Sequence, residues 1–177
     1  MYLVFSILAA LIGAGFSVYM RLELMHPGVQ YMTGADGAPD GHFWNVIVTA
    51  HGLIMVFGAI MPAFVGFANW MIPLQIGASD MAFARMNNFS FWLLPFAFLT
   101  LASTLFMQGG APNFGWTFYA PLSTTYAPPS VTFFIFAVHI MGASSIMGSV
   151  NIIATVLNMR APGMTLMKMP MFCWTWL

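Results

Sequence analysis

Charged side chains are scarce in this sequence, and their scarcity excludes an ordinary soluble domain. Lys and Arg together number four, as do Asp and Glu, so that 5% of the 177 residues are charged, whereas soluble domains carry roughly 25%. The formal net charge of zero gives no reason to expect a nucleic-acid partner. The single cysteine, Cys173, excludes an internal disulfide framework and a cysteine-rich metal cluster.

Apolar residues make up 60% of the chain and form long uncharged stretches. No charged residue lies between Asp40 and Asp80 or between Arg85 and Arg160. Because an α-helix needs about 20 apolar residues to cross a bilayer, we expect an all-α, polytopic transmembrane helix bundle forming a single integral-membrane domain over residues 1–177. The expected spans cover approximately residues 1–20, 43–67, 89–107 and 131–157, with the start of a fifth at 171–177.

The two ends of the chain suggest a piece of a longer protein. The first apolar run starts at Met1 without a basic segment or a cleavage site, so a signal peptide is not predicted. The last apolar stretch stops at Leu177, as a span begins, which is typical of truncation. Three basic residues fall at one side of the predicted membrane and Arg21 at the other, which predicts a cytoplasmic N-terminus; the three are Arg85, Arg160 and Lys168.

Two histidines lie inside predicted spans, where polar groups are costly and are candidates for function. His51 is flanked by the small residues Ala50 and Gly52, which leave room for a large flat ligand, and imidazole commonly binds iron. A histidine hydrogen-bonded between helices fits the same pattern. His139 lies at a similar depth, roughly 13 Å from the outer end of its helix. A four-helix cytochrome with one haem between His51 and His139 is therefore an alternative, although spacing favours a structural role for His139.

The fourth predicted span also carries a stripe of small polar residues. Ser144, Gly148 and Asn151 share one helical face, with Ser145 beside them. Such a stripe can hold a file of water, but spacing alone favours hydrogen bonds between helices. Asp80, the only acid on its side of the membrane, can collect protons for such a file or bond with Arg85 nearby.

The outer loop after the first span concentrates oxygen donors. Carboxylate, amide and backbone carbonyl oxygens suit a hard cation such as calcium, and loops also carry such residues for solvation. The candidate ligands are Glu23, His26, Gly28 and Gln30.

Six strings, taken in order, resemble subunit I of the haem–copper respiratory oxidases, in particular bacterial cytochrome c oxidase. The turn around Asp80 is the most specific of them, and the resemblance covers essentially the whole chain. The strings span residues 21–28, 49–52, 66–74, 80–88, 115–117 and 142–148.

The resemblance implies roles for the candidate residues. His51 would be one axial ligand of a low-spin haem, of type a, with Arg21 hydrogen-bonded to a peripheral substituent and Trp116 near the propionates. Asp80 would be the entrance of a proton channel. Its inner lining would comprise Asn69, Asn87, Ser144, Ser145 and Asn151. A structural calcium or sodium ion would lie among Glu23, His26, Gly28 and Gln30.

As a family member, the full-length subunit, of the twelve-helix type, would pass electrons from cytochrome c to a second haem and copper, reduce oxygen to water and pump protons. Its second axial histidine and its copper ligands would lie in later helices, so this portion alone should not reduce oxygen. The implied partners are a copper-bearing subunit II, a subunit III, cytochrome c, oxygen and lipid, in the bacterial inner membrane.

Three alternatives remain open from the sequence. A quinol-fed oxidase of the same family differs in its electron donor. The small bis-histidine membrane cytochrome would carry electrons without oxygen chemistry, and substitution of His139 would abolish its haem binding. A non-catalytic membrane scaffold would bind no cofactor.

Overall fold

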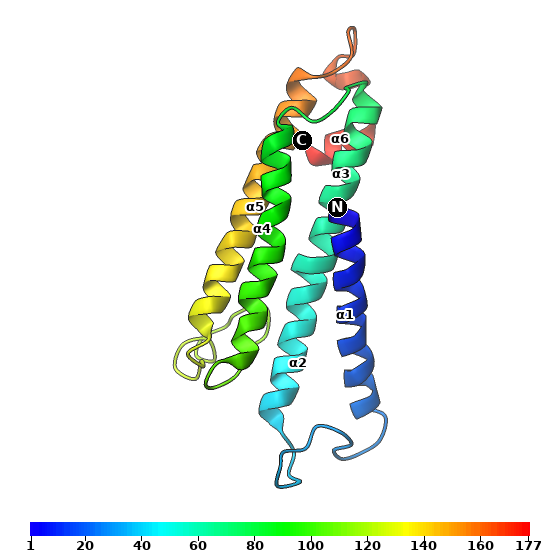
Figure 1. The fold of residues 1–177 in the computed structure, drawn as a ribbon. Helices are drawn as coiled ribbons and strands as arrows, with labels where there is room; N and C mark the ends of the chain where they lie inside the picture. Colours follow the sequence, from blue (N-terminus) through cyan, green and yellow to red (C-terminus); the bar gives the residue numbers. More distant parts are fainter.

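The computed structural model describes residues 1–177 as an elongated bundle of long helices without any β-strand (Figure 1). The expected all-α fold is therefore confirmed. The elements are α1 (Tyr2–Glu23), α2 (Gly41–Leu53), the π-helix η1 (Ile54–Ile60), α3 (Met61–Ile76), α4 (Ala84–Ser103), the 3₁₀ turn η2 (Thr104–Phe106), α5 (Val131–Asn158), the 3₁₀ turn η3 (Leu166–Lys168) and α6 (Met171–Trp176).

Four helical segments are long and apolar enough to cross a membrane. The second is continuous over Gly41–Ile76, because α2, η1 and α3 join end to end over 36 residues. At about 1.5 Å per residue this segment measures roughly 54 Å, longer than the hydrocarbon core of a bilayer, about 30 Å. It extends past the expected limit at residue 67, and α4 begins at Ala84, before the expected residue 89. Hydropathy marks the lipid-crossing part of a helix but does not determine the residue at which the helix begins or ends.

Local chemistry explains where the long second segment starts and stops. The Asp40 carboxylate accepts a hydrogen bond of 2.9 Å from the Phe43 N–H, which caps α2. At the other end Gly77 adopts a left-handed φ of 75°, and the Ala78 N–H donates to the Pro73 carbonyl at 2.9 Å. Pro73 lies in the last helical turn without ending the helix earlier.

The π-helical stretch Ile54–Ile60 follows His51 within one turn. The Met61 N–H bonds to the Val56 carbonyl, five residues back, and the next residue, Pro62, has no N–H with which to continue the pattern. Ser6 on α1 donates a hydrogen bond of 2.6 Å to the Ala59 carbonyl. This bond ties α1 to the widened helix at a point where its backbone bonding differs from that of an α-helix.

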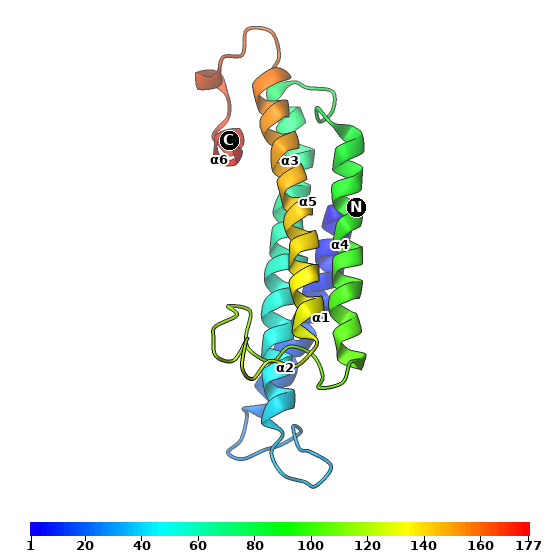
Figure 2. The same ribbon diagram turned by 90° about the vertical axis from the view of Figure 1, so that its left-hand side faces the viewer.

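The bundle consists of two helix pairs, as the two views show together (Figures 1 and 2). α4 packs along α5, while α1 packs along α2, η1 and α3. The close approach of α1 depends on small residues: a Cβ at Gly66 would lie 2.8 Å from a methyl carbon of Leu3. The short α6 folds back against α3 and α5, where Cys173 joins an apolar cluster with Ile72 and Val156.

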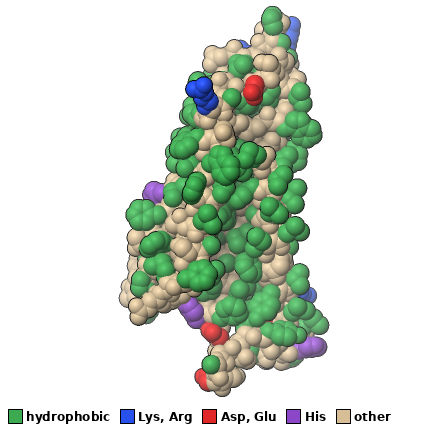
Figure 3. All heavy atoms as spheres, in the orientation of Figure 1, with side chains coloured by type: hydrophobic (Ala, Val, Ile, Leu, Met, Phe, Trp, Pro, Cys, Tyr) green, Lys and Arg blue, Asp and Glu red, His purple; other side chains and the backbone are tan.

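Most of the apolar surface of the bundle remains uncovered. Only 17% of the most apolar window of α1 is buried, and 28% of those of α4 and α5. In the space-filling view the middle of the molecule is hydrophobic and the coloured charged side chains lie towards its two ends (Figure 3). This distribution is that of an integral membrane protein.

Candidate functional site

The turn between α3 and α4 presents Asp80 to solvent at one end of the bundle. Its carboxylate accepts a hydrogen bond of 2.7 Å from the Met81 N–H, and this bond, not one to Arg85, fixes it. Two side chains of α5 bond to the backbone of this turn. Thr155 accepts a hydrogen bond from the Ala82 N–H at 2.9 Å, and Asn151 accepts one from the Phe83 N–H at 2.8 Å.

Beside Asp80 the structure forms an open cavity of about 450 Å³ with a mixed polar and apolar lining, here called the mouth cavity. Asn69 from α3 and Asn87 from α4 line it together with Asp80, so three of the six predicted channel residues share one cavity. The amide nitrogen of Asn69 is buried without a hydrogen-bond partner. Because unpaired buried N–H groups are rare unless water satisfies them, this nitrogen indicates a water site.

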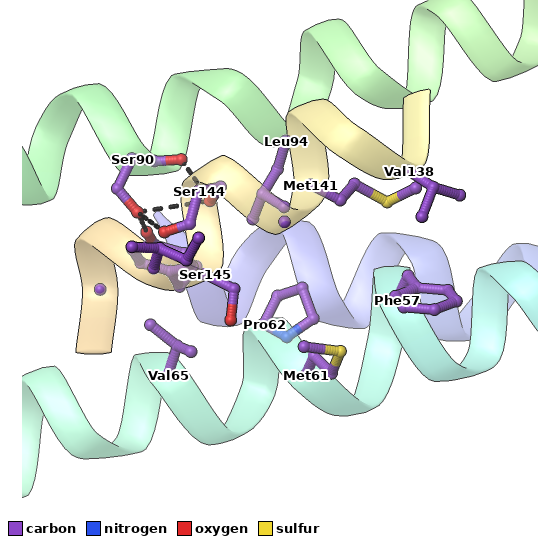
Figure 4. Close-up of a pocket in the computed structure, with 14 residues that line it drawn as sticks. Phe57, Met61, Pro62, Val65, Ser90, Leu94, Val138, Met141, Ser144 and Ser145 are labelled. Carbon is purple, nitrogen blue, oxygen red and sulfur yellow. Dashed lines mark hydrogen bonds between the residues drawn. The ribbon is translucent and has the colours of Figure 1, made fainter. Parts of the chain in front are cut away.

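Deeper in the bundle lies a second cavity of about 360 Å³, here called the inner cavity (Figure 4). Ser144 and Ser145 line it from α5, and the Ser145 side chain points towards Pro62 on the opposite helix. Most of the remaining lining is apolar and includes Phe57 and Met141. Few polar groups would therefore orient water here, and none of them carries a charge.

Tyr2 lines both cavities, so its side chain lies between them. Its hydroxyl lies 2.8 Å from the Ser90 hydroxyl, which donates to the Ser144 carbonyl at 2.8 Å. Ser144 donates in return to the Ser90 carbonyl at 2.7 Å. Ser144 therefore serves the helix–helix bonding that its spacing favours, while Ser145 faces the cavity.

Tyr2 and Ser90 were not predicted from the sequence. Ser90 follows Asn87 by three residues and so shares its helical face, which is a usable signal. Tyr2 stands at the start of an apolar run, where a single polar tip has no distinguishing pattern. Asn151, predicted as channel lining, is completely buried and lines neither cavity; its amide nitrogen, like that of Asn69, has no partner.

His51 lies on α2 and packs against α1. Its Nδ1 donates to the Gly13 carbonyl at 2.9 Å. Because a carbonyl only accepts, Nδ1 carries the hydrogen, and in the neutral ring Nε2 then has the lone pair with which histidine binds a metal. Arg21 lies in the last turn of α1, about 12 Å along the helix from Gly13 at 1.5 Å per residue.

The chain offers one candidate axial ligand for a haem. The free Nε2 of half-buried His51 fits an axial ligand with a backbone carbonyl orienting its ring. Trp116 packs beside it on Gly52. His139 is exposed on α5 and its Nδ1 bonds to the Ile135 carbonyl of its own helix, at 2.8 Å. His51 is held against α1, whereas α5 packs mainly on α4, so the structure does not bring the two histidines to a shared ligand and does not support the bis-histidine alternative.

The predicted cation ligands are only partly gathered. Glu23, His26 and Gly28 line a hollow of about 450 Å³, which Asp40 also lines, but Gln30 does not. The buried Glu23 carboxylate accepts three backbone hydrogen bonds, from Gln30 at 2.9 Å, Tyr31 at 2.7 Å and Met32 at 3.2 Å. The Gln30 amide donates to the Pro27 carbonyl instead.

Comparison with known proteins identifies the family. The family described as "Cytochrome C and Quinol oxidase polypeptide I" matches residues 1–177. The chain is 45% identical, over 200 aligned positions, to "Cytochrome c oxidase subunit 1" of Cereibacter sphaeroides, with 99% of this chain and 35% of that protein covered. The chain thus spans about a third of the length of this relative. Because the match covers every residue, this chain belongs to the family of haem–copper oxidase subunit I polypeptides, as its motifs predicted.

Proposed function

We propose that this chain is the N-terminal portion of the catalytic subunit of a proton-pumping respiratory oxidase in the bacterial inner membrane. The observation that supports this best is that Asp80, Asn69 and Asn87 line one cavity, while Ser145 lines a second cavity deeper in the bundle, with Tyr2 in the walls of both. Polar side chains inside a membrane-spanning bundle are costly and are therefore candidates for function. The same bundle offers the imidazole of His51, whose Nδ1 bonds to the Gly13 carbonyl.

On the electron side, His51 would hold a low-spin haem, of type a, through Nε2. The haem would supply one-electron redox chemistry at this position. The Gly13 carbonyl would fix the imidazole ring and raise its basicity as a ligand. Arg21 and Trp116 would contact the haem periphery, where a guanidinium withdraws electron density and so tunes the potential.

On the proton side, Asp80 would take up protons at the cytoplasmic surface. Water in the mouth cavity would be oriented by Asn69 and Asn87, and water in the inner cavity by Tyr2 and Ser145. Uncharged amides and hydroxyls orient water without holding a proton on a strong base. Asn151 would act mainly by holding the Asp80 turn, through its bond to the Phe83 N–H.

The remaining chemistry would belong to the part of the subunit beyond this chain. The second axial ligand, the second haem, copper and the site of oxygen reduction would lie there, so residues 1–177 alone would not reduce oxygen. Subunits II and III would complete the complex. Cytochrome c is the proposed electron donor because the 45% identical relative is named a cytochrome c oxidase. If the full-length complex oxidised quinol but not cytochrome c, quinol would be the donor instead.

A calcium or sodium ion would occupy the outer hollow. Glu23 has one free lone-pair direction after its three N–H bonds, and His26 and Gly28 would add backbone carbonyls. The candidate site includes Asp40 and leaves Gln30 at its edge.

The test uses the full-length complex in membranes or proteoliposomes. Asp80→Asn should abolish most proton uptake and slow oxygen consumption, whereas Asp36→Asn, in the outer loop, should change neither. His51→Ala should remove the low-spin haem absorption band, and His139→Ala should retain it. Unchanged proton uptake in Asp80→Asn, or a retained low-spin band in His51→Ala, would contradict the proposal.

A further inference from the structure

The outer loop between α4 and α5 is attached to α2 at one buried side chain, Thr49. The Thr49 hydroxyl donates to the Asn45 carbonyl of its own helix at 2.7 Å. It thereby keeps a lone pair with which it accepts the Gly115 N–H at 2.9 Å. Thr49 is only 2% exposed, so water cannot readily replace either bond if the hydroxyl is lost.

The bond from Thr49 holds the residue that precedes Trp116. Gly115 has a left-handed φ of 77°, which directs the chain back across α2. Thr49 and Gly52 are three residues apart and share a helical face. A Cβ at Gly52 would lie 3.3 to 3.5 Å from the Trp116 side chain. The indole therefore packs on the bare backbone of Gly52, next to His51 in the sequence, and a methyl group there would require the indole to shift by a few tenths of an ångström.

The other end of the same turn is clamped to α5. Phe118 has a φ of 60°, an uncommon value for a residue with a side chain. Its ring stacks on Phe134 at 5.2 Å with an interplanar angle of 14°, and the Ser123 hydroxyl donates to its carbonyl at 2.9 Å. Trp116 thus lies between Gly115, which bonds to Thr49, and Phe118, which stacks on Phe134. Trp116 itself remains 53% exposed.

We propose that Thr49 is a positioning residue, which holds the Trp116 indole against Gly52 and so fixes its position beside the group bound at His51. This inference rests on the proposed function, because it assigns Trp116 to the surroundings of the low-spin haem. Thr49 acts only through Trp116. Its loss should therefore matter when Trp116 is present and should be silent when Trp116 is absent.

The structure provides a matched control at the opposite end of the bundle. Thr155 is buried, donates to the Asn151 carbonyl at 2.7 Å, and accepts a loop N–H, that of Ala82, at 2.9 Å. Thr155→Val therefore removes two bonds equivalent to those that Thr49→Val removes, one to a carbonyl of its own helix and one from a loop N–H. Thr155 lies at the other end of the bundle from His51. Thr49→Ser keeps both bonds and serves as the rescue variant.

The measurement is the absorption maximum and midpoint potential of the low-spin haem in the purified full-length complex. Thr49→Val should shift both the absorption maximum and the midpoint potential. Gly52→Ala should also shift them, because its methyl group pushes the indole away from α2. Thr49→Ser and Thr155→Val should leave both at the wild-type values. In a Trp116→Phe background, Thr49→Val should cause no further shift, because the two substitutions interrupt one contact.

A Thr49→Val shift that persists in the Trp116→Phe background would overturn the proposal, as would wild-type values in both Thr49→Val and Gly52→Ala. If the Thr49→Val complex does not assemble, Gly52→Ala is compared with and without Trp116→Phe instead. A Gly52→Ala shift that persists in the Trp116→Phe background would then overturn the proposal. Failure of the proposed function looks different: the low-spin band would then survive His51→Ala, whatever the threonine variants do.

Discussion

Replacing Asn151 by leucine should loosen the turn that carries Asp80 while leaving the helix bundle intact. The Asn151 oxygen accepts the Phe83 N–H at 2.8 Å from a completely buried position. Leucine has a broadly similar size and accepts nothing. The cost of leaving such a donor unpaired is about 1–3 kcal/mol, and because the bond belongs to a turn, we expect the cost to appear as local opening.

Amide hydrogen exchange over residues 80–86 of the full-length protein measures this opening. A cost of that size corresponds to exchange roughly 5- to 150-fold faster in Asn151→Leu than in wild type. Asn158→Leu is the control, since its exposed amide only donates to the Ala154 carbonyl of its own helix. Asn151→Asp keeps the acceptor and should exchange at close to the wild-type rate. Unchanged exchange in Asn151→Leu would refute the idea that this side chain holds the turn.

Three further outcomes are expected from contacts within the bundle and the outer loop. Ser90→Ala removes the hydrogen-bond partner of the Tyr2 hydroxyl and a bond between α4 and α5. Proton uptake should therefore slow, and the free energy of unfolding should fall by about 1–3 kcal/mol. Ser149→Ala, at an exposed position, is the control. Gly66→Val brings carbon within 2.8 Å of Leu3, and the overpacking should cost about 1–3 kcal/mol in thermal unfolding, with no loss in Gly15→Ala, where the space is open. Glu23→Gln weakens three charge-assisted bonds and should speed amide exchange at residues 30–32; equal exchange in both proteins would contradict that role.

The helical spans were predictable because lipid leaves few choices. A chain that crosses hydrocarbon must satisfy its backbone within each segment, so uncharged stretches alone predict helices. The ends of these helices were less predictable. Ala84 to Asn88 are mostly polar or small and resemble a loop in hydropathy, yet they form the first turn of α4. The π-helical stretch has no sequence pattern of its own.

The candidate site was partly predictable, and the reason differs for each residue. Asp80 and His51 stand out because an ionisable group near or within a membrane span needs an explanation. The grouping of Asp80 with Asn69 and Asn87 depends on how α3 meets α4, which one-dimensional spacing does not determine. The roles of Tyr2, Thr49 and Gly52 were not predictable, because their importance lies in contacts with residues distant along the chain.

The π-helix Ile54–Ile60 affects how the two halves of one continuous helix are rotated relative to each other. The separation between His51 and Asn69 equals about five turns of an unbroken α-helix, which would place both side chains on the same side. In a π-helix each hydrogen bond spans five residues instead of four. One extra residue accommodated in this way rotates the rest of the helix by up to roughly 100°. The widened stretch therefore changes the rotation between the half that carries His51, whose Nδ1 bonds to the Gly13 carbonyl of α1, and the half that carries Asn69, which lines the mouth cavity. An inserted or deleted residue within Ile54–Ile60 would misdirect one face relative to the other, even in a helix of unchanged hydropathy.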